Sequence, residues 1–156
     1  MSRPGIQADI LTPQGWCRGA LRWNEQGEIE AIEGERIEEG EAGQAGRKIA
    51  LPGFVDLHVH GAGGSDVMDA GDAARTIAQT VARHGTTAWL ATTMTAPTAD
   101  ITRALEALSH HMRALPAKAS QAGGARMLGV HLEGPHISAD KLGAQPNFVA
   151  PIDMEQ

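Results

Sequence analysis

The sequence has few of the residues that disulfide-rich, membrane-spanning or nucleic-acid-binding proteins need. Its one cysteine, Cys17, excludes an internal disulfide, and its strand-like surroundings favour a structural thiol over a nucleophile. No apolar run approaches the roughly 18 residues that span a bilayer, and residues 1–13 lack the apolar core of a secretory signal. Thirteen lysines and arginines against nineteen aspartates and glutamates give a formal net charge of −6. We therefore expect a cytoplasmic protein with no nucleic-acid or membrane partner.

The first 50 residues have the pattern of a small β domain. Short apolar pieces are separated by turns rich in glycine, glutamate and asparagine, which is typical of short antiparallel strands. Residues 33–46 are rich in glutamate and glycine, and we expect them to form a solvated connecting loop without chemistry of its own.

The rest of the chain alternates between strand and helix patterns. Such alternation is typical of a parallel sheet, and strands this apolar must be covered on both faces. An open doubly wound sheet and the start of a closed barrel both fit this pattern. From the apolar spacing we predict strands over 49–61, 86–93 and 125–133, and helices over 72–84 and 100–115.

The most informative stretch is residues 51–61, Leu-Pro-Gly-Phe-Val-Asp-Leu-His-Val-His-Gly. His58 and His60 are two residues apart on a predicted buried strand, so their side chains point to the same side. A lone histidine is more often satisfied by hydrogen bonds in a core. This pair, however, ends an apolar strand and precedes a glycine-rich turn, which is where barrel enzymes keep their active sites. We therefore interpret the pair as metal ligands.

A second polar cluster ends the third predicted strand, in the sequence Val-His-Leu-Glu-Gly-Pro-His over residues 130–136. Glu133 is the last residue before a Gly-Pro turn. If the three strands are consecutive in one barrel, their carboxyl ends open into the same cup, and Glu133 lies beside the histidine pair. There it could bind one metal ion or bridge two. The alternative is an ion pair with Arg126 or Lys141.

The other histidines carry weaker signals. His131 shares a face with Glu133, and it is either a site residue or a core histidine held by a backbone carbonyl. His136, just past the turn, could reach a substrate or lie at the rim. Three further histidines lie at helix ends or on helix faces, where we expect them at the surface: His84, His110 and His111.

Together, these motifs resemble the N-terminal part of the N-acetylglucosamine-6-phosphate deacetylases, within the metal-dependent amidohydrolase superfamily. The resemblance covers essentially the whole chain, and His-Leu-Glu-Gly-Pro is its most specific part. The pattern Pro-Gly-Phe-x-Asp-x-His-x-His, which residues 52–60 match, occurs across the superfamily, including dihydroorotase-like and adenine deaminase-like enzymes. The resemblance implies part of a small β-sandwich domain over residues 1–50, followed over residues 51–156 by the first three βα units of a TIM (β/α)₈ barrel.

For function, the resemblance implies metal-dependent hydrolysis of N-acetylglucosamine 6-phosphate to glucosamine 6-phosphate and acetate. Glu133 would be a metal ligand, and His58 and His60 would complete a second metal position in some of these enzymes. One or two divalent ions are therefore expected, and Zn²⁺ suits imidazole and carboxylate ligands most readily.

The resemblance also places substrate contacts. Gly134 would shape the turn below the N-acetyl group, and Ala144 and Gln145 lie in a stretch that matches a loop touching the sugar phosphate. Many relatives carry histidine where this chain has Gln145, which can donate a hydrogen bond but adds no positive charge.

The barrel would be incomplete in these 156 residues, because a (β/α)₈ barrel takes about 250 residues. We expect a fragment or truncated product, with the remaining metal ligands and the general acid and base beyond residue 156. The complete protein would be a homo-oligomer acting on a small molecule. Two alternatives stay open, namely another metal-dependent amidohydrolase, such as a cyclic amidase or deaminase, and a non-catalytic fragment.

Overall fold

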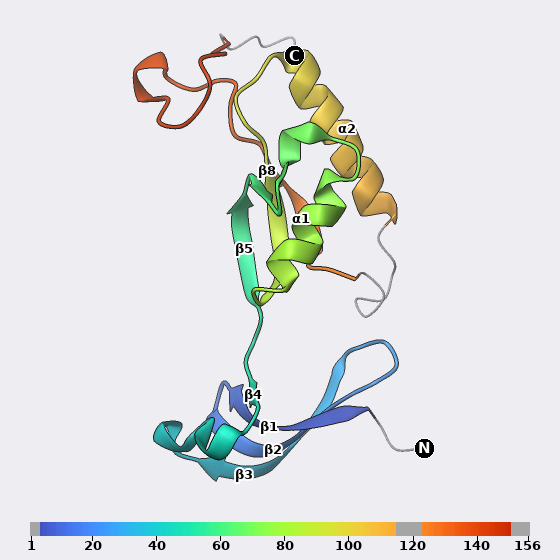
Figure 1. Ribbon diagram of the computed structural model, residues 1–156, viewed down its shortest axis with the longest axis vertical. Helices are drawn as coiled ribbons and strands as arrows, with labels where there is room; N and C mark the ends of the chain where they lie inside the picture. Colours follow the sequence, from blue (N-terminus) through green and yellow to red (C-terminus); the bar gives the residue numbers. More distant parts are fainter. Residues whose placement is uncertain (1–3, 115–122, 151–156) are drawn as a thin grey trace. The chain divides into compact units, whose positions relative to one another are not determined.

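Two units make up the part of the chain that the computed structural model describes, residues 4–114 and 123–150 (Figure 1). Their boundary falls between Pro52 and Gly53. The first unit is a small, mainly antiparallel sheet, and the second alternates parallel strands with helices. The mixed α/β class predicted from the sequence is confirmed at this level.

The first unit is one four-stranded sheet in the order β3-β2-β1-β4. The first three strands along the chain pair antiparallel, and the last pairs parallel with β1. The strands are β1 (Gly5–Thr12), β2 (Gly15–Trp23), β3 (Ile29–Ile37) and β4 (Ile49–Ala50).

The predicted loop over residues 33–46 is wrong in its first part. Residues 33–37 belong to β3 and pair with residues 16–20 of β2. The glutamates of β3 are exposed to solvent, so the strand has little apolar pattern and is held by backbone pairing instead. Two short 3₁₀ turns follow, η1 (Glu39–Glu41) and η2 (Gln44–Gly46).

A buried carboxylate ties these turns to the sheet. Asp9 of β1 is fully buried, and it accepts hydrogen bonds from the Arg18 guanidinium at 2.9 Å and from the Gly43 N–H at 3.0 Å. Arg18 also donates to the Glu41 carbonyl at 3.1 Å. The hydrogen bond from Arg18 is the main reason that the pKa of Asp9 lies below its ordinary value; burial opposes this shift and the Gly43 N–H supports it.

The second unit is built on a parallel sheet in the order β5-β8-β9. Two crossover helices connect consecutive strands, and a short hairpin and a 3₁₀ turn follow β5. The elements are β5 (Phe54–Val59), β6 (Gly61–Ala62), β7 (Ser65–Asp66), η3 (Val67–Asp69), α1 (Ala73–Ala82), β8 (Thr86–Thr92), α2 (Thr98–Ala114), β9 (Arg126–His131) and η5 (Ala139–Lys141).

Both helices of this unit cover the same face of the sheet. Trp89 of β8 and Met127 of β9 pack in one core with Ile77 of α1 and Leu108 of α2. The order of the described strands across this sheet follows their order along the chain, without the reversal of strand order that a doubly wound sheet has. Within residues 4–114 and 123–150, neither helix has the length and apolarity to cross a bilayer.

The predicted strand over residues 49–61 is divided between the two units. Pro52 has no N–H to extend a ladder, and it separates β4 from β5. The other predicted strands and helices agree with β8, β9, α1 and α2 to within two residues at each end. Parts of the predictions lie outside the described residues, namely residue 115 of the second helix, residues 1–3 of the first domain, and residues 115–122 and 151–156 of the second.

The prediction that this strand is buried is wrong for most of β5. Phe54, Val55 and Leu57 are 67%, 57% and 59% exposed, whereas Val59 is buried. The reason is its position: β5 is an edge strand of the described sheet, and the helices cover only one face.

We predict that Asp9→Asn lowers the stability of the first unit and makes that stability depend less on pH in the acid range. Because the pKa of Asp9 is lower in the folded state, its stabilising effect is present above its ordinary pKa of 3.8 and is lost as the pH falls below that value. Hydrogen-exchange protection of β1 and β2 amides, at pH 7 and near pH 3, measures both effects. As a control, Glu33→Gln removes only an exposed cross-strand pair with Arg22 and should be nearly neutral. Equal effects of the two substitutions would contradict the prediction.

Candidate metal centre

The candidate site lies where the parallel strands end. His58 is the last residue but one of β5, His60 follows that strand directly, and Glu133 comes two residues after β9. β8 lies between these two strands. Since the strands are parallel, their carboxyl ends meet at one edge of the sheet, and the three side chains from two distant stretches of sequence come together there.

The three possible ligand atoms form a nearly equilateral triangle. The Nε2 atoms of His58 and His60 are 3.1 Å apart, and each is 3.3 Å from Oε2 of Glu133. The Glu133 carboxylate lies against these two rings, and no ion pair joins it to Arg126 or Lys141 within the described residues.

This triangle has the size that suits one metal ion. Bonds of about 2.0–2.2 Å in a tetrahedral site place ligand atoms about 3.3–3.6 Å apart, and the observed separations lie at or just below the lower end of that range. Oε2 of Glu133 is buried, and its contacts with the rings lack hydrogen-bond geometry, so among the described residues it has no hydrogen-bond partner. A cation would satisfy this costly buried oxygen. The donor set therefore fits a divalent ion such as Zn²⁺.

A backbone carbonyl sets the tautomer of His60. Its Nδ1 lies 3.2 Å from the carbonyl oxygen of Thr92, which can only accept a hydrogen bond. Nδ1 therefore carries the proton in the neutral ring, and Nε2 presents its lone pair to His58 and Glu133.

Two other predicted histidines lie around the site. His131 is held by a backbone carbonyl, with Nδ1 3.3 Å from the Leu57 oxygen, but it is exposed and is not a core residue. Its ring packs edge to face on His58 with centroids 4.8 Å apart. His136 is exposed in the following loop, where its Nδ1 donates to the Ala150 carbonyl at 3.1 Å.

Two threonines that no sequence pattern marked as site residues hold the ligand-bearing segments. Thr92 and Thr93 are both fully buried at the end of β8. The Thr92 hydroxyl accepts a hydrogen bond from the Val59 N–H at 3.0 Å, and the Thr93 hydroxyl accepts one from the Glu133 N–H at 3.0 Å. The sequence feature that could have identified them is a pair of threonines at the end of an apolar strand, because hydroxyls buried there need hydrogen-bond partners.

The predicted substrate-binding residues lie directly beyond Glu133. Gly134 has a φ of 72°, and a Cβ there would collide with Oγ1 of Thr95. The Gln145 side chain accepts from the Thr95 N–H at 2.7 Å and donates to the sulfur of Met94 at 3.5 Å. Ala144 is exposed beside it. Gln145 thus ties its loop to the segment after β8, and the substrate contacts of Gly134, Ala144 and Gln145 stay predictions.

The remaining histidines lie away from the three ligand candidates. His84 and His110 are exposed, as expected, but His111 is not. Its side chain is partly buried, and Nε2 is buried without a partner among the described residues. Burial lowers the pKa of His111; Arg75 adds to this effect and Asp72 opposes it.

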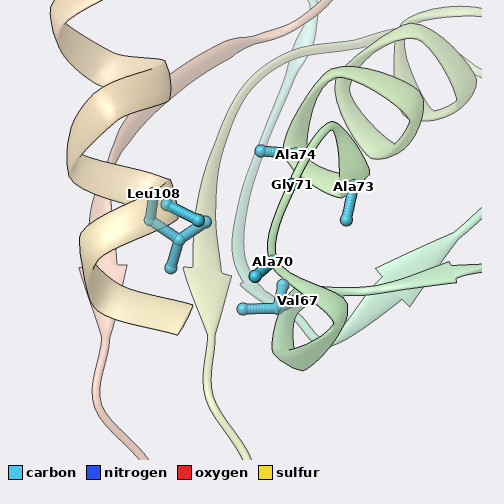
Figure 2. A pocket seen from close by; sticks show the side chains of 7 residues that line it. Val67, Ala70, Gly71, Ala73, Ala74 and Leu108 are labelled. Carbon is cyan, nitrogen blue, oxygen red and sulfur yellow. The ribbon is translucent and has the colours of Figure 1, made fainter. Parts of the chain in front are cut away.

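A small pocket between the start of α1 and α2 shares no residue with the site (Figure 2). It is lined by Val67, Ala70, Gly71, Ala73, Ala74, Ala107 and Leu108. These side chains are apolar, so they offer no group that would orient a polar ligand.

The sequence is similar to those of a known protein family. The sequence profile of the amidohydrolase family matches residues 49–146, which include all three ligand candidates. The chain belongs to the amidohydrolase family. The resemblance predicted from the sequence is therefore confirmed.

Relatives of this amidohydrolase chain are named as deacetylases of amino-sugar phosphates. The N-acetylglucosamine-6-phosphate deacetylase of Vibrio furnissii is 40% identical over 142 residues, which cover 88% of this chain and 34% of that protein. The N-acetylgalactosamine-6-phosphate deacetylase of Escherichia coli O157:H7 is 36% identical over 140 residues, with the same coverage. The solved structure of N-acetylglucosamine-6-phosphate deacetylase from Thermotoga maritima matches 97% of this chain and 38% of its own, with 26% identity and a TM-score of 0.71. The amidohydrolase chain spans about a third of the length of these relatives.

We predict that Gly134→Ala lowers the stability of this amidohydrolase more than Gly143→Ala does. Both glycines have positive φ, so both substitutions strain the backbone by about 1–2 kcal/mol. The Cβ added at Gly134 would also collide with Thr95, whereas a Cβ added at Gly143 has no neighbour within 4 Å. We expect an additional loss of about 1–3 kcal/mol for Gly134→Ala in urea unfolding of the intact protein. A loss equal to that of Gly143→Ala would show that the close approach to Thr95 is unimportant.

Proposed function

We propose that the protein carrying these residues is a metal-dependent deacetylase that converts N-acetylglucosamine 6-phosphate and water to glucosamine 6-phosphate and acetate. The observation that carries this proposal is the triangle formed by His58, His60 and Glu133, with sides of 3.1–3.3 Å, in a chain of the amidohydrolase family. The names of the relatives support the substrate class. Because the chain spans only part of those relatives, the activity is proposed for the whole protein.

The fold proposed for the whole protein is a (β/α)₈ barrel with a small β-sandwich. Strand order along the parallel sheet and helices on one face support the barrel. The exposed side chains of β5 would be covered by further strands and helices of such a barrel. In the first unit, Ile29 and Ile32 are 65% and 40% exposed on a single sheet, and a second sheet of a sandwich would cover such residues.

Each site residue has a defined part in the proposed reaction. A bound divalent ion supplies Lewis acidity, which polarises the amide carbonyl and makes a water molecule more acidic. Glu133 would neutralise part of the ion's charge, and His58 and His60 would hold it through their Nε2 lone pairs. The carbonyl of Thr92 keeps the proton of His60 on Nδ1, away from the ion. The three donor atoms lie 3.1–3.3 Å from one another, and this spacing supports the binding of one ion. We propose that the general acid that protonates the leaving amine lies beyond these residues.

The related sugar N-acetylgalactosamine 6-phosphate is the second candidate substrate, because one relative at 36% identity is named for it. A cyclic amidase or deaminase reaction is the alternative within the superfamily. The products separate these possibilities, since only deacetylation releases acetate and only deamination releases ammonia.

We predict that Glu133→Gln in the intact protein lowers Zn²⁺ content and lowers acetate release by roughly 100-fold or more, because even residues that only support a ligand contribute 10–100-fold. Metal analysis and acetate assays with both sugar phosphates measure this, with circular dichroism to check the fold. Glu106→Gln, on the exposed surface of α2, is the matched control and should change neither quantity. Unchanged zinc content and turnover in Glu133→Gln would overturn the ligand assignment.

A further inference from the structure

We propose that Thr93 is a positioning residue for Glu133, and that its hydroxyl fixes the backbone from which the carboxylate reaches the metal position. This inference rests on the proposed function, since it takes Glu133 as a ligand. It concerns a residue that contributes no ligand atom itself.

The hydroxyl of Thr93 makes two hydrogen bonds to the same residue. It accepts from the N–H of Glu133 at 3.0 Å and donates to the carbonyl of Glu133 at 3.2 Å. A hydroxyl has one proton and can accept through its lone pairs, so both bonds form at once. Together they fix both backbone polar groups of Glu133, and with them the direction of its Cα–Cβ bond.

These bonds are needed because the sheet ladder ends just before Glu133. The last paired residues of β8 and β9 are Thr92 and His131, and the N–H of Thr93 adds one bond to the His131 carbonyl at 3.1 Å. Beyond this point the chain after β8 leads into α2 and has no strand left to pair with Glu133. The Thr93 hydroxyl takes the place of a strand partner, and because Thr93 is fully buried, water does not compete for it.

The neighbouring threonine has the corresponding role on the other side of the site. Thr92 binds the Val59 N–H through its hydroxyl and His60 through its carbonyl, so it holds the end of β5. Thr93 holds the segment after β9. Their separate partners allow the role of Thr93 to be tested without disturbing the histidine pair.

The test uses Thr93→Val, Thr93→Ser and Thr87→Val in the intact protein. Valine keeps the size and branching of threonine but leaves both backbone groups of Glu133 without the hydroxyl, whereas serine keeps the hydroxyl. Thr87 is the matched control: it is on the same strand, and its hydroxyl donates to the Phe54 carbonyl at 3.2 Å near the other end.

The main measurement is Zn²⁺ affinity, by competition with a chromophoric chelator, together with the melting temperature of the metal-free protein. We expect Thr93→Val to weaken Zn²⁺ binding about 10–100-fold, Thr93→Ser to stay close to wild type, and Thr87→Val to leave affinity unchanged. Acetate release by Thr93→Val should rise toward the wild-type rate when Zn²⁺ is raised to saturation. A folded Thr93→Val protein with wild-type Zn²⁺ affinity would overturn the inference.

Two further comparisons keep the result interpretable. If Thr93→Val does not fold, Thr93→Ala and Thr93→Ser, which differ only in the hydroxyl, replace it; equal Zn²⁺ affinity in these two would also overturn the inference.

Glu133→Gln separates this inference from the proposed function. Loss of Zn²⁺ in Glu133→Gln but not in Thr93→Val refutes only the role of Thr93, whereas wild-type binding by Glu133→Gln refutes the ligand assignment on which both depend.

Discussion

The parallel pairing of three consecutive strands is the constraint on which the candidate site depends. His58 and Glu133 are 75 positions apart in the sequence. They meet because β5 and β9 flank β8 in the same direction, which places the carboxyl ends of all three at one edge. The pairing of Val59 with Ala91, and of Thr92 with His131, sets the height at which each ligand-bearing segment leaves the sheet. A shift of register in either pair would separate the imidazoles from the carboxylate.

Much of this arrangement follows from patterns that the sequence displays. The helices α1 and α2 have apolar residues at helical spacing, so their positions were predictable to within two residues. The two-residue spacing of His58 and His60 on a strand, and the position of Glu133 before a Gly-Pro turn, predicted that the three side chains lie together. The structure brings them to within 3.3 Å of one another.

The features that the sequence predicted wrongly or missed depend on backbone pairing between strands, or on which elements pack against a strand. β3 is held by hydrogen bonds to β2 and carries exposed glutamates, so its composition resembles that of a loop. β5 has an apolar sequence, but burial depends on what lies against it and cannot be deduced from the strand alone. Thr93 was not predicted because a threonine near a strand end is common, and its two bonds to Glu133 exist only once β8 and β9 are paired.

The exposure of β5 has a consequence for the behaviour of the protein in solution. Phe54-Val-Asp-Leu-His-Val59 is a six-residue strand with one carboxylate, and no strand of the described residues pairs with its outer edge, which lies beside large apolar side chains. Strands of this kind are templates for pairing with another chain, and the charge of Asp56 is the only feature within this strand that opposes it. Any state of the protein that leaves this edge uncovered is therefore prone to self-association, so the covering of β5 bears on solubility as much as on the metal position.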